Sequence, residues 1–222
     1  MPGFEKGCRM KRMFVIAIGL VLLVGVFGCA ARQPVQTIMV PPRVDLAPHQ
    51  MIGVMEFDSD TKGKLASFAT RRFVEMARRD QGVLRVMDLG PGRSALRTAG
   101  QKAWSPALYK TVGEKHGVKT VFLGELSISN IRPGISLAGA LRSGEITAEV
   151  DATLAVNLVE TATGASLWSG SARLTRSIGH LSVFRGGDFV FDAEDPEEAY
   201  GDFVDALVER VTRDFRATWV RR

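Results

Sequence analysis

The clearest pattern of hydrophobic and polar positions lies between residues 146 and 158, where the two kinds alternate. One set is apolar: Ile146, Ala148, Val150, Ala152, Leu154, Val156 and Leu158. The other set holds Thr147, Glu149, Asp151, Thr153 and Asn157. Because successive side chains of a strand point to opposite faces, this period of two predicts a long, half-buried strand. Residues 160–164 are typical of a hairpin turn, and residues 165–176 of its antiparallel partner strand.

Shorter apolar runs alternate with helical patterns before this hairpin. Three runs are predicted strands: residues 51–57, 83–89 and 118–129. Residues 64–79 carry apolar side chains at the spacing of an amphipathic helix, which Gly82 ends. Ser105 and Pro106 indicate an N-cap followed by proline at the first helical position, and Gly117 is a typical stop. We therefore predict a βαβαβ unit with a parallel or mixed sheet.

The remaining chain contains loops and one further helix. Three stretches have loop composition: residues 90–100, 130–144 and 178–193. The last helix is predicted to begin at Asp195, an N-cap residue followed by Pro196 and by Glu198 at the capping-box position. Its apolar stripe comprises Tyr200, Phe203, Val204, Leu207, Val208, Val211 and Phe215. We expect it to pack on the sheet and to end near Trp219. The predicted fold class is α/β, with a βαβαβ unit, a long antiparallel hairpin and a C-terminal helix.

The chain begins with the pattern of a secretory signal. An uncharged run of 15 residues, 13–27, follows four basic residues, Lys6, Arg9, Lys11 and Arg12. The string Val26-Phe27-Gly28-Cys29 resembles the lipobox of bacterial lipoproteins, although Phe27 stands where a small residue is usual. The resemblance implies that residues 1–28 are a signal peptide and that Cys29 is acylated as the new N-terminus. The alternative is an uncleaved anchor helix, but the run is shorter than the roughly 18 to 20 residues that a spanning helix needs.

Removal of this signal changes the charge and cysteine content. The full chain carries a net charge of +5, and residues 1–28 hold four basic residues and one acid, so the mature chain has a net charge of +2. Composition therefore gives no support to nucleic acid as a partner. Of the two cysteines, Cys8 leaves with the signal and Cys29 carries lipid. No thiol then remains for a disulfide, a zinc site or a nucleophile.

A proline-rich segment separates Cys29 from the predicted domain. Residues 29–50 contain Pro34, Pro41, Pro42 and Pro48 and are interpreted as a lipidated, extended tether. Residues 51–222 are interpreted as one periplasmic α/β domain. In bacteria of the enteric type, an Asp after the acylated cysteine favours retention in the inner membrane. Because Ala30 stands there, we predict attachment to the bacterial outer membrane, facing the periplasm.

Several short motifs carry part of a signature for cofactor or metal binding. Residues 90–95 fit the loose dinucleotide pattern, but polar residues separate them from the helix expected at Pro106, so a loop is favoured. Residues 58–63 begin like a calcium loop, but Lys62 and Ala69 occupy ligand positions. Three histidines lack zinc-site spacing: His49, His116 and His180. The sequence predicts no catalytic residue, no cofactor and no metal site.

Charged and aromatic groups suggest binding surfaces instead. Arg71, Arg72, Arg78 and Arg79 crowd one predicted helix and are a candidate surface for an anionic partner; the alternative is a solvated helix face. Five acids near residue 195 would attract a cation or simply complement the helix dipole: Asp192, Glu194, Asp195, Glu197 and Glu198. The C-terminal arginines and Trp219 form either an interface or a frayed helix end. Trp104 and Trp168 are interpreted as packing residues.

The hairpin region resembles a superfamily of periplasmic lipoproteins. Residues 120–126 (TVFLGEL) and 156–170 (VNLVETATGASLWSG) are similar to its pattern of a strand ending in Gly, then L-v-d-x-x-T-G-x-x-L-W. Its members include the curli secretion lipoprotein (CsgG-like), the penicillin-binding-protein activator lipoprotein (LpoB-like) and the Pel polysaccharide export lipoprotein (PelC-like). The resemblance covers roughly residues 51–215. It implies a three-layer α/β sandwich and a role in envelope assembly, export or regulation without catalysis.

A curli-type channel would need membrane-spanning hairpins. The insert candidates are residues 130–144 and 178–193, and each arm of the second is about half of the 9 to 11 residues that a membrane strand requires. We therefore expect no spanning strands. The leading hypothesis is an outer-membrane lipoprotein that binds periplasmic or outer-membrane protein partners, with the arginine helix and the polar strand face (Thr147, Glu149, Asp151, Thr153) as candidate surfaces. The alternatives are a ring-forming homo-oligomer of an export machine, an activator of a cell-wall synthase, a carbohydrate-binding module and an enzyme.

Overall fold

The structure, a computed structural model, describes residues 37–134, 147–178, 182–183, 189–191 and 193–221. The predicted signal peptide and Cys29 lie outside the described residues. Two compact units are distinguished, residues 39–218 and residues 1–38 with 219–222. The larger unit is the α/β domain. The described part of the smaller one belongs to a two-stranded ribbon of β1 (Thr37–Val40) and β11 (Thr218–Arg221).

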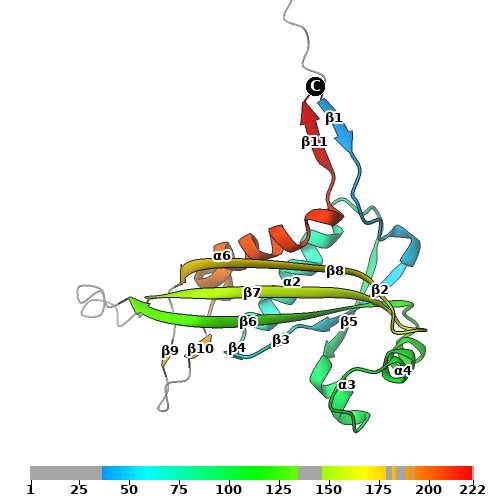
Figure 1. The fold of residues 1–222 in the computed structure, drawn as a ribbon, viewed down its shortest axis with the longest axis horizontal. Helices are drawn as coiled ribbons and strands as arrows, with labels where there is room; N and C mark the ends of the chain where they lie inside the picture. Colours follow the sequence, from blue (N-terminus) through cyan, green and yellow to red (C-terminus); the bar gives the residue numbers. More distant parts are fainter. Residues whose placement is uncertain (1–36, 135–146, 179–181, 184–188, 192, 222) are drawn as a thin grey trace, which may run out of the picture. The chain divides into compact units, whose positions relative to one another are not determined.

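One six-stranded sheet organises the larger unit (Figure 1). Its principal strands are β2 (Met51–Glu56), β5 (Arg85–Pro91), β6 (Thr120–Gly134), β7 (Thr147–Glu160) and β8 (Ser166–Ile178), in the order β5-β2-β6-β7-β8. Strand β2 runs parallel to β5 and β6, whereas β7 is antiparallel to both of its neighbours, β6 and β8. The short β3 (Asp58–Ser59) adds parallel to β6. The sequence prediction of a βαβαβ unit followed by a long hairpin is confirmed.

Helices cover both faces of this sheet. They are α2 (Leu65–Arg78), α3 (Gly92–Thr98), α4 (Pro106–His116) and α6 (Pro196–Val211). The larger core packs α2 and α6 against one face, which presents Val54 and Phe122. A smaller core packs α4 against the opposite face, which presents Met55 and Val121. Because neighbouring residues of each strand enter different cores, the domain has three layers, as the resemblance implied.

Capping explains where two helices begin. The Ser105 side chain accepts a hydrogen bond from the Leu108 backbone N–H at 3.3 Å. The Asp195 carboxylate accepts from the backbone N–H groups of Glu197 at 2.9 Å and Glu198 at 3.3 Å. These bonds satisfy N–H groups that the first helical turn leaves unpaired, so both predicted starts are confirmed.

The predicted end of the last helix is wrong. Helix α6 stops at Val211, and a 3-10 turn, η2 (Arg213–Phe215), leads to β11 rather than to a helix ending near Trp219. The turn directs Phe215 into the core, where the side chain is fully buried. Burial of Phe215 and pairing of β11 with β1 are long-range interactions, which a local apolar stripe does not encode.

All three predicted loops contain regular structure. Residues 92–98 form α3, and β6 continues through the predicted loop at 130–144 as far as Gly134. A register shift between Ser129 and Arg132 accommodates Asn130, whose φ of 50° is left-handed. The rest of that loop lies outside the described residues. In the third loop, β9 (Ser182–Val183) pairs antiparallel with β10 (Phe189–Phe191), which joins β4 (Lys62–Gly63) in parallel.

Ordered packing also reaches into the segment interpreted as a tether. Leu46 is fully buried in the larger core, and the turn η1 (Ala47–His49) follows it. The Leu46 backbone N–H donates to Gln81 Oε1 at 2.7 Å. A fully buried core residue therefore stands five positions before β2.

Candidate functional site

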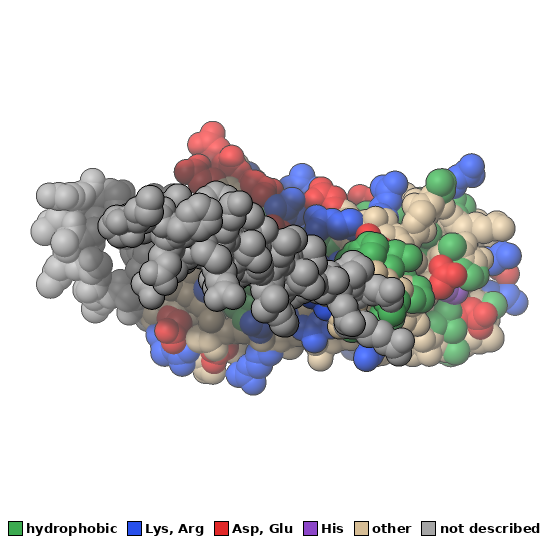
Figure 2. All heavy atoms as spheres, turned by 90° about the horizontal axis from the view of Figure 1, so that it is seen from above, with side chains coloured by type: hydrophobic (Ala, Val, Ile, Leu, Met, Phe, Trp, Pro, Cys, Tyr) green, Lys and Arg blue, Asp and Glu red, His purple; other side chains and the backbone are tan. Residues whose placement is uncertain are grey.

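Three of the four candidate arginines form an exposed surface on α2 and its C-cap residue, which we call the α2 arginine face: Arg71, Arg78 and the C-cap Arg79. In the described part of the chain, none of the three makes an ion pair. The Arg71 guanidinium lies 5.9 Å from the centre of the Phe68 ring, which supports it without neutralising its charge. In the view of Figure 2, basic and acidic side chains lie next to one another over much of the surface, and one group of acidic side chains lies at the upper edge.

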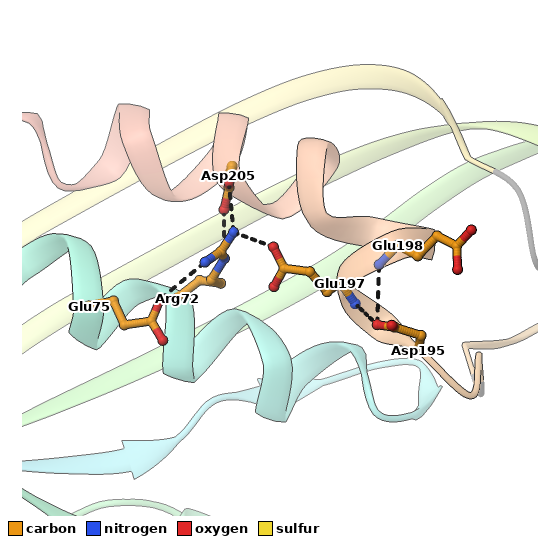
Figure 3. A network of polar contacts seen from close by, with 6 residues as sticks. All are labelled: Arg72, Glu75, Asp195, Glu197, Glu198 and Asp205. Carbon is orange, nitrogen blue, oxygen red and sulfur yellow. Dashed lines mark hydrogen bonds and ion pairs between the residues drawn. The ribbon is translucent and has the colours of Figure 1, made fainter.

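Arg72, the fourth candidate, links helices α2 and α6 through ion pairs (Figure 3). Its Nη2 donates to Glu197 Oε1 at 2.6 Å and to Asp205 Oδ2 at 3.0 Å, and its Nη1 donates to Glu75 Oε2 at 3.2 Å. Burial opposes the charge, but the hydrogen bond to Glu75 and the charges of Asp205 and Glu197 raise the pKa of the Arg72 guanidinium. Three carboxylates therefore pair with Arg72, whereas helical spacing alone put its side chain on the same side of the helix as Arg79.

The polar strand face is also less accessible than its alternation indicated. Asp151 is only 7% exposed. Its carboxylate accepts hydrogen bonds from Thr175 Oγ1 at 2.6 Å and Asn130 Nδ2 at 2.8 Å, and Arg132 Nη2 lies at 3.3 Å. The bonds from Thr175 and Asn130 lower the pKa of Asp151, with a smaller contribution from the charge of Arg132. Its expected place on an exposed face is wrong, because side chains from the strands on either side cover it. Glu149 is exposed.

A cleft of about 390 Å³ opens on the α3 and α4 side of the sheet. It is lined by Glu56, Asp58, Trp104, Tyr109, Glu125 and Asn157, among others, and we call it the aromatic–acidic cleft. The residues come from β2, β3, α4 and the segment just before it, β6 and β7. Sequence reasoning missed it, because residues from five separate segments meet only through the sheet order.

The aromatic side of this cleft is a stacked pair. The rings of Trp104 and Tyr109 lie 5.0 Å apart with an interplanar angle of 12°. A Cβ at Gly92 would stand 3.4 Å from Trp104, and one at Gly164 would stand 3.2 Å from Tyr109, so two glycines allow the backbone to approach the rings. Burial raises the pKa of the Tyr109 phenol. The phenol therefore stays protonated at neutral pH and can donate a hydrogen bond.

The carboxylates on the acidic side of the cleft differ in whether a cation pairs with them. Asp58 Oδ1 pairs with Arg93 Nε at 2.9 Å, which offsets its charge. Glu56 and Glu125 make no ion pair and no side-chain hydrogen bond within the described ranges. Asn157 Oδ1 accepts from Ser169 Oγ at 2.5 Å, which orients the amide on the cleft floor. The cleft thus combines an aromatic surface with polar groups that are available to a ligand.

The dinucleotide-like and calcium-like motifs have structural roles. Gly90 and Gly92 lead directly into α3, contrary to the predicted intervening loop, but α3 has only 7 residues and Gly92 is buried against Trp104. In the calcium-like segment, Asp60 accepts from the Ile128 N–H at 3.1 Å and from Ser127 Oγ at 3.0 Å. Across the described residues, no group of three potential metal ligands is found.

Trp168, the tryptophan of the lipoprotein-like motif, packs at the end of the larger core. Its ring centre lies 4.4 Å from that of Phe215, and its Nε1 donates to Asp214 Oδ2 at 3.2 Å. The tryptophan therefore fixes the turn after α6, which agrees with its interpretation as a packing residue. Of the helices that the structure describes, none has the length and apolar character needed to cross a membrane.

The fold is thus a three-layer mixed α/β sandwich. Comparison with solved structures gives similarity to a PelC dodecamer from Paraburkholderia phytofirmans, at 12% identity over 81% of this chain and 96% of that chain, with a TM-score of 0.45. The LpoB C-terminal domain from Salmonella enterica matches at 12% identity over 61% and 84% of the two chains, with a TM-score of 0.35. Lipoprotein GNA1162 from Neisseria meningitidis matches at 14% identity over 57% and 83%, also at 0.35.

These matches include the PelC-like and LpoB-like proteins that the hairpin motifs resembled. The resemblance to the curli secretion lipoprotein stays a prediction. No protein-family model matches the chain, and no curated protein matches it.

Proposed function

We propose that this chain is a lipoprotein of the bacterial outer membrane that faces the periplasm and acts as a non-catalytic binding or assembly component of envelope biogenesis or export. Residues 1–28 would be the signal peptide and Cys29 the acylated residue. The basic start, the short apolar run and the Gly28-Cys29 pair support the anchor. Ala30 after the cysteine supports the outer membrane.

The α2 arginine face is the observation that carries the binding role. Its three guanidinium groups are exposed on one helix, and no described carboxylate neutralises them. Guanidinium groups bind carboxylates and phosphates through two parallel hydrogen bonds and attract anionic partners over a distance. The partner proposed for this face is therefore an acidic surface of a periplasmic or outer-membrane protein.

Charge reversal on α2 tests this surface. We expect the triple variant Arg71→Glu, Arg78→Glu, Arg79→Glu to lose partner capture in crosslinked pull-downs from envelopes, with an unchanged circular dichroism spectrum and Tm. Arg72 is kept, because it ties α2 to α6. The matched control reverses three exposed cations elsewhere, Arg97, Lys102 and Lys115. Identical partner profiles for the two triple variants would eliminate the α2 arginine face.

The anchor is tested separately. Cys29→Ser is expected to leave the domain folded and to accumulate the unprocessed precursor, which the mass of the N-terminal peptide reports. A variant that is processed normally would overturn the lipoprotein assignment. A ring-forming subunit of a secretion or polysaccharide-export machine remains the alternative role, and sedimentation velocity of the acylated protein in detergent separates it from a monomer. An activator of a cell-wall synthase would instead capture the synthase in the pull-down.

The aromatic–acidic cleft favours a second candidate function, binding of glycan. Sugar rings present apolar C–H faces that pack on aromatic rings and hydroxyl groups that bond to carboxylates and amides. The Trp104–Tyr109 pair beside Glu56, Glu125 and Asn157 provides both kinds of group. Calorimetry with soluble peptidoglycan fragments should show binding that Trp104→Ala removes and that the control Trp219→Ala preserves. Absence of binding to the unaltered protein would remove this candidate.

A further inference from the structure

Most of the exposed large hydrophobic side chains gather on the two-stranded ribbon. They are Ile38, Met39 and Val40 of β1 and Trp219 and Val220 of β11, with Trp219 67% exposed. Elsewhere in the described ranges, only Val83 and Leu167 belong to this class. Every residue of both strands is exposed. Because successive side chains of a strand point to opposite faces, the ribbon presents apolar groups on both of its faces.

A large apolar surface that no described element covers indicates an interaction site. We propose that the ribbon of β1 and β11 is a membrane-contact element, which places Trp219 and its apolar neighbours in the headgroup region of the bilayer that holds Cys29. The inference rests on the proposed acylation of Cys29.

Chain length places the ribbon near that bilayer. Thr37 lies eight positions after Cys29, and a fully extended segment of eight residue steps spans at most about 29 Å. Thr37, the first residue of β1, therefore lies no farther than this from Cys29. Any apolar surface within such reach meets the headgroup region at a high local concentration.

The side-chain chemistry also fits a lipid interface. Tryptophan is enriched at the level of the headgroups because its ring is apolar and its N–H is polar. Arg221 lies on β11 beside Val220, and Arg222 follows it in the sequence. Arginines at this position favour a surface that contains anionic lipid.

A second copy of the chain fits the ribbon less well. The two strands comprise 4 residues each. A stable interface between proteins uses about 20 to 30 residues on each side. The ribbon alone is therefore too small for a stable dimer, whereas interfacial insertion needs only a few apolar side chains next to an acyl anchor.

Fluorescence quenching tests the contact on the acylated protein. The protein, with acylation checked by mass spectrometry, is reconstituted in phosphatidylethanolamine–phosphatidylglycerol vesicles with or without brominated acyl chains. We expect bromolipid to quench Trp219, and Trp219→Phe to abolish the quenched component while Trp104 and Trp168 stay unquenched. The matched control carries Val83→Trp in the Trp219→Phe background, which places a reporter at an exposed site outside the ribbon.

Each outcome decides the inference. Quenching that depends on Trp219 and is absent from the Val83 reporter supports it. No quenching, or equal quenching at both positions, overturns it, and so does a Trp219-dependent dimer in detergent without quenching in vesicles. If mass spectrometry finds Cys29 unmodified, the proposed anchor is wrong. The ribbon is then tested by the same quenching measurement, with vesicles added to the unacylated protein.

Discussion

Gln81 is joined to Phe215 by a buried hydrogen bond, in which Gln81 Nε2 donates to the Phe215 carbonyl oxygen at 2.7 Å. The same amide donates to the Val44 carbonyl at 3.0 Å and accepts from the Leu46 N–H at 2.7 Å. One side chain after α2 thus satisfies backbone groups of the segment before β2 and of the turn after α6. These buried groups would otherwise remain without a partner, which costs more than a hydrogen bond contributes.

Substitution of Gln81 by Leu should therefore destabilise the domain strongly. Leu has a similar volume but satisfies none of the three backbone groups, so we expect the free energy of unfolding to fall by about 2–4 kcal/mol. Urea denaturation followed by circular dichroism measures the change. Gln101→Leu is the control, because the Gln101 side chain makes one hydrogen bond within the described ranges, which it accepts from Ser105 Oγ. If Gln81→Leu costs no more than this control, Gln81 does not hold the two segments together.

Two helical glycines should respond in opposite ways to Ala. At Gly113 in α4, a Cβ would collide with Thr161 Oγ1 and lie 3.0 Å from the Val118 carbonyl oxygen. Thr161 cannot easily yield, because it is buried and donates to Val118 and Lys119. Ala gains about 1 kcal/mol of helix propensity over Gly, but overpacking costs about 1–3 kcal/mol. We expect Gly113→Ala to lower the Tm.

At Gly201 in α6, the nearest atom to an added Cβ is Glu197 Oε1 at 3.5 Å, an ordinary contact. Gly201→Ala should therefore raise the free energy of unfolding by up to about 1 kcal/mol. Thermal unfolding of both variants makes the comparison. Equal shifts for the two would show that propensity, and not the space around each glycine, decides the outcome.

Local sequence patterns predicted the elements that are determined by residues close to one another in the sequence. The β7–β8 hairpin followed from alternation and a turn, and the starts of α4 and α6 followed from Ser105 and Asp195, whose bonds are made within three residues. Helix α3 was missed because 7 residues are too few to show a helical period.

The missed features of the candidate surfaces depend on distant residues. Arg72 is paired by Glu197 and Asp205, which lie 125 and 133 positions away. Asp151 is covered by Asn130 and Thr175 from the two neighbouring strands. Alternation correctly placed Asp151 on the face opposite the core, but it could not tell which side chains would lie across from it.

Removal of Arg72 should cost stability that removal of Arg71 does not. Arg72→Met keeps the apolar stem and deletes the charge shared with Glu75, Glu197 and Asp205, so we expect a loss of about 1–2 kcal/mol. Arg71→Met is the matched control, because Arg71 is exposed and has no described ion-pair partner; its effect should stay within about 0.5 kcal/mol. Denaturation at low and high salt measures both. A salt-independent loss for Arg72→Met would indicate packing rather than charge.

Asp151 should make the stability of the domain sensitive to acid. Hydrogen bonds from Thr175 and Asn130 lower the pKa of its carboxyl in the folded state. The stabilisation is therefore fully present above the unfolded-state pKa of about 3.9 and is lost as the pH falls through the lower folded-state pKa. Asp151→Asn cannot ionise, so the variant should be less stable than the unaltered protein at pH 7. The difference between the two should shrink as the pH is lowered below 4.

Urea midpoints from pH 7 down to the acid limit measure this convergence. The control is Asp202→Asn, because Asp202 is exposed and its carboxylate pairs with no described cation, so its midpoints should run parallel to those of the unaltered protein. Parallel curves for Asp151→Asn would mean that the carboxyl is not held in its ionised form by Thr175 and Asn130. Thr175→Val gives an independent check. It removes the donor of the 2.6 Å bond, so it should weaken the same acid dependence without deleting the charge.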